Sequence, residues 1–280
     1  MITKIIACAD VHFKSLRGID EQKIVFEEFI KQCKEIVAEN GAEQTRIVVA
    51  GDIFDAKIAV TNESILAVHW FLKELNDVCK TIVIAGNHDL LRDNLTRIDS
   101  LTPLFEIGDL PNVVYLDKIL DYKSGCLLDD DVVWCDFSIF EDFNPPCVKA
   151  EREKYRGKSY KYVGLVHADV TGAITTTNFS TEFGLDPNLF EDCDFVVAGH
   201  IHKTQEIKKN GVKIVYCSSI RQKEFGETVT EHGFVLWDVS TPEEPEYEYR
   251  EVENKEGGYF KFAITEIEDI ENDYEELINL

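Results

Sequence analysis

Short apolar runs alternate with amphipathic stretches over the first hundred residues. The apolar runs at residues 2–9, 46–50 and 81–85 are typical of buried strands. The two stretches between them, residues 20–39 and 61–78, repeat apolar positions at a near-helical period, which predicts amphipathic helices. The order strand, helix, strand, helix, strand predicts a parallel sheet with right-handed crossovers, and therefore an α/β fold.

The rest of the chain has a stronger strand pattern. Asn210-Gly211, between two strand-like runs, predicts a hairpin because this dipeptide favours a two-residue turn. A break at residues 241–245 predicts a main domain over residues 1–240, followed by an acidic C-terminal extension over residues 241–280. Further strands are predicted at residues 113–116, 132–137, 162–166, 195–198, 205–209, 213–217, 233–239, 246–253 and 259–264, and helices at 187–190 and 266–280.

Composition narrows the class of protein. The chain has 280 residues, 44% of them hydrophobic, which is enough for one substantial core. No apolar run reaches the roughly eighteen residues of a membrane-spanning helix, so no membrane association is expected. The N-terminal run continues into polar residues without a cleavage site. The eight cysteines show no C-x-x-C spacing, so we expect reduced thiols in a cytoplasmic protein, in the host cytoplasm if the source is viral.

The net charge of −24 argues against a free basic surface for nucleic acid. Contacts to DNA phosphates need Lys or Arg, so this acidity counts against tight, unaided binding of DNA. Two bound divalent cations would offset about four of the negative charges at a single site.

Five short polar motifs each follow an apolar, strand-like run. In an open α/β sheet the carboxyl ends of the strands form the ligand-binding edge, so these motifs are expected to converge in space. Glycine precedes Asp52, Asn87 and His200, where it allows tight turns and close backbone approach. The motifs are Asp10-Val11-His12, Gly51-Asp52-Ile53-Phe54-Asp55, Gly86-Asn87-His88-Asp89, His167 and Gly199-His200-Ile201-His202.

The residue types in these motifs suit two divalent cations. Carboxylate, amide oxygen and imidazole favour Mn, Mg, Fe or Zn, and no cysteine joins the set. Asp10 and His12 are two residues apart, as are His200 and His202, and an extended backbone points side chains at that spacing to one side. Asp52 is the natural bridge between two ions, because its strand lies in the middle of the set.

Taken singly, these motifs carry little weight. An Asp-x-His or Gly-x-His pair rarely marks a site, and Asn-His in a turn is usually only a turn. Five of the seven histidines nevertheless fall at the ends of predicted strands, which favours a functional centre. His69, inside a predicted helix, and His232, at the start of a strand, are expected to be structural or solvent-facing.

With all five motifs in order, the chain resembles the calcineurin-like metallophosphoesterase superfamily. The resemblance implies a four-layer α-β-β-α sandwich of two mixed sheets that hydrolyses phosphoesters with two divalent ions. Within the superfamily, the second and third motifs and residues 218–227 are similar to the SbcD-type DNA repair nucleases. The Ser/Thr phosphatase branch would show G-D-x-V-D-R-G and G-N-H-E, where this chain has Ala56-Lys57 and Asp89.

The resemblance also implies roles for individual residues. His88 would contact the scissile phosphate or protonate the leaving oxygen, and Asp89 would orient His88. Asp55 stands where some relatives have a phosphate-contacting His, which leaves its role open. Mn²⁺ is the expected ion, with Mg²⁺ as the alternative. The implied ligands are Asp10, His12, Asp52 and His202 for the first ion, and Asp52, Asn87, His167 and His200 for the second.

Partners follow from the same resemblance. DNA is the implied substrate and an SbcC-like coiled-coil ATPase is the implied partner. A homodimer is expected through residues 61–78 and 90–104. Relatives carry a DNA-binding cap after the nuclease core, whereas forty residues follow Ser240 here. Residues 241–280 are therefore expected to be a reduced cap or a partner-binding segment.

Three functions stay open on the sequence. The first is an exo- and endonuclease subunit that hydrolyses DNA together with the ATPase. The second is a phosphodiesterase or phosphatase acting on nucleotides or other small phosphoesters, which the acidity and the missing cap favour. The third is a catalytically silent scaffold, which the intact ligand set argues against.

Overall fold

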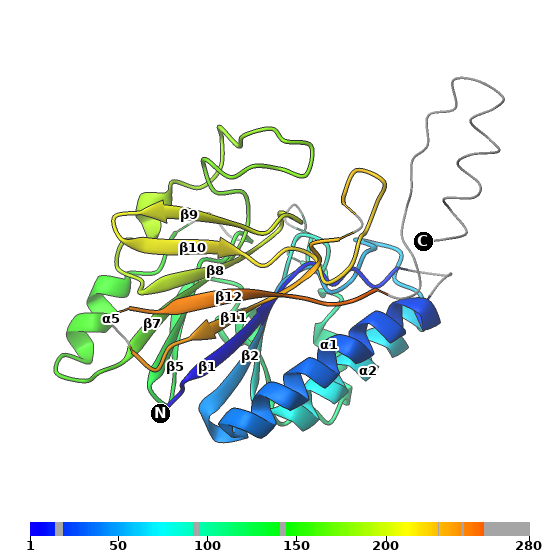
Figure 1. Ribbon diagram of the computed structural model, residues 1–280, viewed down its shortest axis with the longest axis horizontal. Helices are drawn as coiled ribbons and strands as arrows, with labels where there is room; N and C mark the ends of the chain where they lie inside the picture. Colours follow the sequence, from blue (N-terminus) through cyan, green and yellow to red (C-terminus); the bar gives the residue numbers. More distant parts are fainter. Residues whose placement is uncertain are drawn as a thin grey trace.

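The strands within the described residues form two six-stranded sheets (Figure 1). The computed structural model describes residues 1–14, 19–91, 94, 96–140, 144–228, 230–241 and 244–254. The strand predicted at residues 259–264 and the helix predicted at 266–280 lie outside these residues.

The first sheet is built from both ends of the described chain. Its order is β12-β11-β1-β2-β3-β4, with β1 to β4 parallel and β11 antiparallel to both β1 and β12. Part of the predicted C-terminal extension, as β12, therefore belongs to this sheet. The strands are β1 (Lys4–Cys8), β2 (Thr45–Ala50), β3 (Thr81–Ile84), β4 (Val113–Tyr115), β11 (Gly233–Asp238) and β12 (Glu246–Glu251).

Two long helices cover the outer face of the first sheet. α1 (Ile19–Asn40) and α2 (Asn62–Val78) lie side by side beneath β1 and β2 in Figure 1. Their apolar stripes bury Phe26 and Phe71, whose ring centroids are 5.4 Å apart. A capping box between Thr61 and Ser64 begins α2. These helices are the crossovers that make β1, β2 and β3 parallel, as the sequence predicts.

The second sheet has the order β5-β6-β7-β8-β10-β9, with antiparallel strands at both edges. Its four inner strands run parallel. The predicted hairpin is confirmed: Asn210 and Gly211 join β9 to β10 with φ of 50° and 89°. The strands are β5 (Gly125–Asp129), β6 (Val132–Asp136), β7 (Lys161–His167), β8 (Phe195–Gly199), β9 (Gln205–Lys209) and β10 (Val212–Tyr216).

Three apolar layers hold the fold together. One lies beneath α1 and α2, a second lies between the sheets, and a third lies on the far face of the second sheet under α5 (Val148–Lys154) and the 3-10 helix η2 (Pro187–Phe190). Between the sheets, Phe195 stacks on Trp237 at 4.0 Å between ring centroids. The predicted four-layer α-β-β-α sandwich is confirmed.

Short elements are the ones that sequence periodicity does not reveal. β5 was not expected, because its residues are mostly half-buried and show no alternation. A turn in which Asp130 has a φ of 53° leads from β5 into β6. The remaining helices are too short for a period to show. They are η1 (Ala42–Gln44), α3 (Thr102–Ile107) and α4 (Leu116–Ile119).

Candidate metal centre

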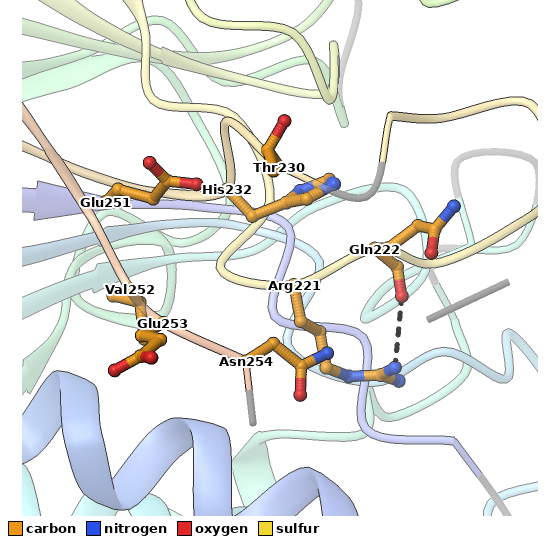
Figure 2. Close-up of a pocket in the computed structure, with 8 residues that line it drawn as sticks. All are labelled: Arg221, Gln222, Thr230, His232, Glu251, Val252, Glu253 and Asn254. Carbon is orange, nitrogen blue, oxygen red and sulfur yellow. Dashed lines mark hydrogen bonds between the residues drawn. The ribbon is translucent and has the colours of Figure 1, made fainter. Parts of the chain in front are cut away.

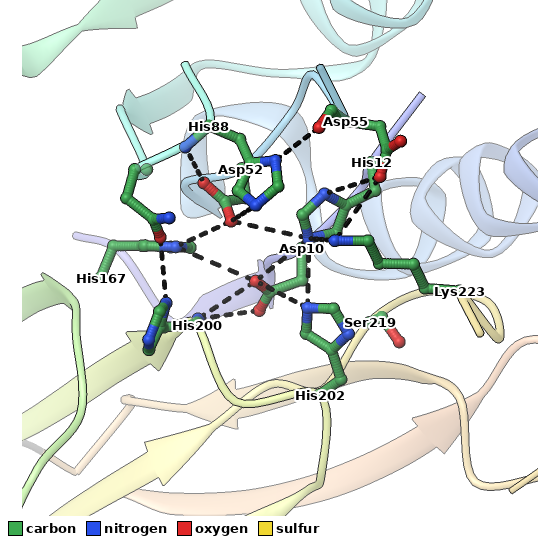
Figure 3. Close-up of polar contacts among 12 residues, drawn as sticks. Asp10, His12, Asp52, Asp55, His88, His167, His200, His202, Ser219 and Lys223 are labelled. Atoms are coloured by element: carbon green, nitrogen blue, oxygen red, sulfur yellow. Dashed lines mark hydrogen bonds and ion pairs between the residues drawn. The ribbon is translucent and has the colours of Figure 1, made fainter. Parts of the chain in front are cut away.

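The five motifs converge where the carboxyl ends of strands from both sheets meet (Figure 3). Asp10, Asp52 and Asn87 follow β1, β2 and β3 of the first sheet. His167 ends β7 of the second sheet, and His200 follows β8. β2 lies between β1 and β3, so Asp52 is central, as predicted. The predicted convergence of the motifs is confirmed.

The backbone of the centre is left-handed at several non-glycine residues. Asp10, His12, Asp52 and His200 have φ values of 52°, 47°, 53° and 89°. Such conformations are uncommon outside glycine and concentrate at functional sites. The expectation that an extended backbone aims Asp10 and His12 to one side is therefore wrong. The two side chains still meet, with 3.8 Å between His12 Nε2 and Asp10 Oδ1.

Backbone hydrogen bonds lock the motifs together. The amides of Asp10 and His12 donate to the carbonyl oxygens of Gly51 and Asp52, at 3.0 and 2.9 Å. The His200 amide donates to both carboxylate oxygens of Asp10, at 3.0 and 3.2 Å. The His88 amide donates to Asp52 Oδ1 at 2.8 Å. Each carboxylate is thus held by the backbone of a different motif.

Glycine is required where these loops approach one another. A Cβ atom at Gly51, which has a φ of 88°, would lie 2.4 Å from His167 Nδ1. At Gly86 it would lie 2.1 Å from Asp52 Oδ1. Both distances are far below a van der Waals contact, so the predicted need for close backbone approach is confirmed.

The first group of predicted ligands comprises Asp10, His12 and His202, whose ligand atoms lie within 4.8 Å of one another. Nε2 of His12 and Nε2 of His202 face each other at 3.1 Å. Both rings also face Asp10 Oδ1, with His202 Nε2 at 3.4 Å.

The second group comprises Asp52, His167 and His200, again within 4.8 Å. His167 Nε2 lies 3.2 Å from Asp52 Oδ2, and His200 Nδ1 lies 3.0 Å from Asn87 Oδ1. The same Asp52 oxygen is 3.6 Å from His12 Nε2 of the first group. Asp52 therefore stands between the groups, in the position that a bridging carboxylate needs.

The orientation of the imidazole rings fits two divalent cations. His167 Nδ1 bonds the Ala50 carbonyl oxygen at 2.7 Å, and His202 Nδ1 bonds Glu227 Oε1 at 2.6 Å. Acceptors at Nδ1 leave a lone pair on Nε2, which is the arrangement found behind metal-binding histidines. Nε2 of His167 is buried, and among the described residues the polar atom that it faces is Asp52 Oδ2, at 3.2 Å. The lone pairs of these imidazoles and the carboxylate oxygens are all electron-rich and face one another. A cation bound between them would stabilise this arrangement.

The charges of the centre point the same way. Burial lowers the pKa of a histidine, but the Asp52 carboxylate overcomes it and raises the pKa of His167 to about 9. Burial also opposes charge on His202, yet Asp10 and Glu227 raise its pKa to about 10. Despite its own burial, Asp52 has a lowered pKa, mainly because of His167 and His12. Burial instead lowers the pKa of His12. The centre thus favours positive charge at His167 and His202, which divalent cations can supply in place of protons.

His88 lies beside both groups and is oriented by a backbone carbonyl. Its Nδ1 lies 2.5 Å from the Asp55 carbonyl oxygen, and its Nε2 faces inward, 3.9 Å from Asp52 Oδ2. The ring packs edge-on against His12, with 4.8 Å between centroids. His88 is therefore close to the predicted ligands, with its Nε2 turned toward Asp52.

Asp89 does not touch the His88 ring. Its carboxylate accepts hydrogen bonds from the amides of Gly86, Ile53 and Phe54, at 3.0, 3.1 and 2.9 Å. Burial, and then the nearby Asp52 charge, raise the pKa of Asp89 to about 7. These bonds go to the backbone and not to the His88 ring, so the expected orientation of His88 by Asp89 stays a prediction that would act through the turn. Asp89 ties the turn after β3 to the turn after β2.

Three further side chains reach the centre. Glu227 contacts His202, Lys223 Nζ lies 3.4 Å from His12 Nε2, and Asp169 Oδ2 lies 3.6 Å from His200 Nε2. Glu227 and Lys223 belong to residues 218–227, the stretch whose sequence resembles that of SbcD-type nucleases. That resemblance assigns no role to either residue. Asp169 has no sequence signal of its own. The two remaining histidines lie elsewhere, as expected, and His232 Nδ1 is 2.9 Å from Ser219 Oγ.

Two clefts flank the centre. One of about 530 Å³ is lined by His202 and Glu227, and the other, of about 400 Å³, is lined by Asn87, His167 and His200. Phe183, on the wall of the second cleft, is 98% exposed. Both clefts have the size of small-molecule or nucleotide subsites.

The protein family follows from these features together with a family model. The model described as Calcineurin-like phosphoesterase matches residues 3–204, a span that contains all seven predicted ligands. The chain belongs to the calcineurin-like phosphoesterase family. Membership implies metal-dependent hydrolysis of phosphoesters, and the two groups of predicted ligands are candidate metal sites of this phosphoesterase. His12 also belongs to a third group that could hold an ion, with Asp55 and His88.

Two other comparisons place the phosphoesterase among known proteins. It is 30% identical over 236 residues to an uncharacterized protein of Acanthamoeba polyphaga mimivirus, covering 82% of this chain and 17% of that relative. The chain thus spans a small part of the relative's length. It is also similar to the solved structure of GAP50, the anchor in the inner membrane complex of Plasmodium. The TM-score is 0.48 and the identity 11%, over 92% of this chain and 91% of that one.

All eight cysteines of the phosphoesterase are free, and six of them are buried, in agreement with the expected reduced thiols. Within the described residues, no helix is long and apolar enough to cross a membrane.

Proposed function

We propose that this phosphoesterase is a two-metal DNA phosphodiesterase, a nuclease subunit that acts with an SbcC-like coiled-coil ATPase. The observation that carries the proposal is the position of residues 218–227, the stretch that resembles SbcD-type nucleases. This stretch lies against the candidate metal centre, where Glu227 bonds His202 at 2.6 Å and Lys223 approaches His12 at 3.4 Å.

Each residue of the centre has a proposed task. Asp10, His12, Asp52 and His202 would hold one ion, and Asp52, Asn87, His167 and His200 the other, with Mn²⁺ as the expected metal and Mg²⁺ as the alternative. Two such ions neutralise charge on the phosphate and lower the pKa of an attacking water. Glu227 and the Ala50 carbonyl fix the rings of His202 and His167, so that both offer Nε2 to the ions.

His88 is the proposed proton donor to the leaving oxygen. With Nδ1 bonded to the Asp55 carbonyl oxygen, a second proton on Nε2 points into the centre. Burial lowers the pKa of His88, while Asp52 opposes that effect. A general acid works best when its pKa lies near the working pH, so the Asp52 carboxylate, which counters the effect of burial on His88, favours this role.

Nucleotide-containing substrates are supported by Phe183. Its ring is almost fully exposed on the wall of the cleft beside His167 and His200. Nucleobases of single strands stack on such aromatic rings irrespective of sequence. A frayed DNA end could place its terminal base there while the phosphate lies over the centre.

The acidity of the chain supports the partner proposal. At a net charge of −24, phosphate contacts along a duplex would have to come mostly from another subunit. We propose that the ATPase provides them. A homodimer through residues 61–78 and 90–104 is also proposed, and it is supported by Leu66, which is 68% exposed on α2. Light scattering of the wild type and of Leu66→Glu tests the dimer, which would dissociate in the variant.

The nuclease assay uses end-labelled duplex and hairpin DNA with Mn²⁺ or Mg²⁺, with and without the ATPase. We expect Mn²⁺-dependent cleavage by the wild type, a loss of about 10²-fold or more in His88→Ala with its metal retained, and a loss of metal in Asp52→Asn. Absence of DNA cleavage under all of these conditions, together with rapid hydrolysis of a chromogenic diester, would contradict the proposal.

The second candidate function is hydrolysis of nucleotides or other small phosphoesters. Two features favour this function. The net charge of −24 disfavours binding of a long nucleic acid, and the two clefts have the size of a small phosphoester. A panel of cyclic nucleotides, mononucleotides and chromogenic diesters separates the two functions. A kcat/KM for one small ester far above that for DNA would support this alternative.

A further inference from the structure

We propose that Lys223 binds a non-bridging oxygen of the scissile phosphate. The inference rests on the phosphoester hydrolysis proposed for the same centre, and it names a residue that the seven predicted ligands and His88 do not include. Asp55, whose role the sequence left open, becomes the residue that positions Lys223.

The Lys223 ammonium group lies inside the centre. Figure 3 shows the side chain reaching in beside His12, with contacts to His12 and Asp55. Nζ lies 3.4 Å from His12 Nε2, the nitrogen that faces Asp10 and Asp52, and 3.5 Å from Asp55 Oδ1. The Lys223 side chain is only 19% exposed. A largely buried ammonium so close to a metal-facing nitrogen is placed to meet the anion that the metals bind.

The backbone around Lys223 is fixed from both sides. The Lys223 amide donates to Glu227 Oε2 at 2.6 Å, and the other oxygen of that carboxylate bonds His202. The Lys14 ammonium donates to the Lys223 carbonyl oxygen at 2.5 Å. One carboxylate therefore fixes both a predicted ligand and the residue that carries the ammonium.

Arg221 anchors the start of this segment. Its guanidinium donates to Gln22 Oε1 on α1 at 3.0 Å and to the His12 carbonyl oxygen at 3.3 Å. Arg221 lines a cavity of about 330 Å³. Figure 2 shows its side chain there, with its bond to the Gln222 carbonyl oxygen. The approach of Lys223 to His12 is therefore built into the packing of α1 and residues 218–227.

Charge explains why a lysine here would act on substrate. An ammonium has three N–H donors and no lone pair, so it cannot be a metal ligand. Asp55 would offset the repulsion between Lys223 and bound cations, but at 3.5 Å that contact is longer than a good charge-assisted hydrogen bond. A phosphate oxygen between Lys223 and the ions would pair with the ammonium charge. Lysines bind phosphate in this way at other phosphate sites.

His88 and Lys223 would then divide the work. Both lie next to His12, His88 edge-on against its ring and Lys223 against its Nε2. His88 would serve the leaving oxygen, and Lys223 an oxygen that stays on phosphorus. Removal of Lys223 should therefore weaken binding of any phosphate and slow good and poor leaving groups equally.

The test measures binding of inorganic phosphate to the Mn²⁺-loaded protein by calorimetry. We compare the wild type with Lys223→Met and Lys223→Arg, and with Lys208→Met as a control that removes the same charge from exposed β9. We expect about a tenfold or greater rise in the phosphate Kd for Lys223→Met, at most about threefold for Lys223→Arg, and no change for the control. Metal content should remain that of the wild type.

A separate variant distinguishes two roles of Lys223. Its ammonium either contacts the phosphate or only forms a salt bridge with Asp55. Asp55→Asn keeps the ammonium, so it should change the phosphate Kd much less than Lys223→Met does. Equal effects of the two variants, or an unchanged Kd in Lys223→Met with metal retained, would overturn the inference. Because phosphate binding needs no DNA cleavage, the inference is tested even if the wild type fails the nuclease assay.

Discussion

A carboxylate behind a metal-binding histidine fixes which ring nitrogen faces the ion. Glu227 takes this place behind His202, with 2.6 Å between Oε1 and Nδ1. Despite its burial, Glu227 has a lowered pKa, chiefly because of that histidine, and it stays ionised. At the scale of single residues, the centre therefore depends on side chains that would not touch an ion themselves.

Glu227→Gln tests this dependence. The amide keeps the shape of the side chain but loses its charge, so His202 should become a weaker and less ordered ligand. We expect Mn²⁺ affinity to fall about 10-fold to 100-fold, measured by calorimetry. Glu191→Gln, at an exposed position, is the control. Equal affinities in the wild type and Glu227→Gln would show that Glu227 does not support the site.

At the scale of elements, the turn after β3 carries Asn87 and His88 past the Asp52 carboxylate. Gly86→Ala would place a Cβ 2.1 Å from Asp52 Oδ1, so the turn and the carboxylate would have to separate. We expect loss of most bound metal and of phosphodiesterase activity. Gly226→Ala, whose Cβ meets nothing closer than 3.9 Å, should behave as the wild type. Full metal content in Gly86→Ala would contradict the tight packing of this turn.

A buried pair of carboxyl groups supports the same turn from below. Asp117 accepts a hydrogen bond from the Ala85 amide at 2.6 Å, directly before the turn, and contacts Asp136 at the end of β6. Burial raises the pKa of Asp117 to about 7, and burial together with Asp117 raises that of Asp136 far above its usual range. The folded protein thus holds a proton here that the unfolded chain releases near pH 4.

This proton makes stability depend on pH. Because the folded state binds more protons, the free energy of unfolding should fall as pH rises from about 4 to 7 and above. Asp136→Asn mimics the protonated form, so its stability should fall less over that range than the wild type's, by on the order of 1–2 kcal/mol. Urea unfolding at pH 5 and pH 8 measures this, with exposed Asp109→Asn as control. Parallel pH profiles would contradict it.

The sequence could predict the elements whose patterns are local. Apolar runs followed by polar residues located β1, β2, β3, β7 and β8, and with them the convergence of the seven predicted ligands. Partners that depend on the approach of distant loops could not be predicted. Examples are the bond from His88 to the Asp55 carbonyl and the left-handed φ of Asp10, which neighbouring loops impose rather than the local sequence.

At the scale of the whole molecule, metal binding should stabilise the fold, because the centre joins strands from both sheets. An ion that binds only the folded state, at about 100 times its Kd, adds about 2.7 kcal/mol. That corresponds to a rise of several degrees in Tm for a protein of about this size. Scanning calorimetry with Mn²⁺ or with EDTA tests this, and Asp52→Asn should show a smaller rise. An unchanged Tm at saturating Mn²⁺ would contradict the placement of the site.

The number of metal ions per chain tests the central claim most directly. The protein is loaded with Mn²⁺, desalted and analysed by mass spectrometry for metal, with protein measured by amino-acid analysis. The two groups of ligands joined at Asp52 predict about two ions per chain in the wild type and in His88→Ala, and at most about one in Asp52→Asn. Less than one ion per chain in the wild type, or two in Asp52→Asn, would contradict a two-metal centre bridged by Asp52.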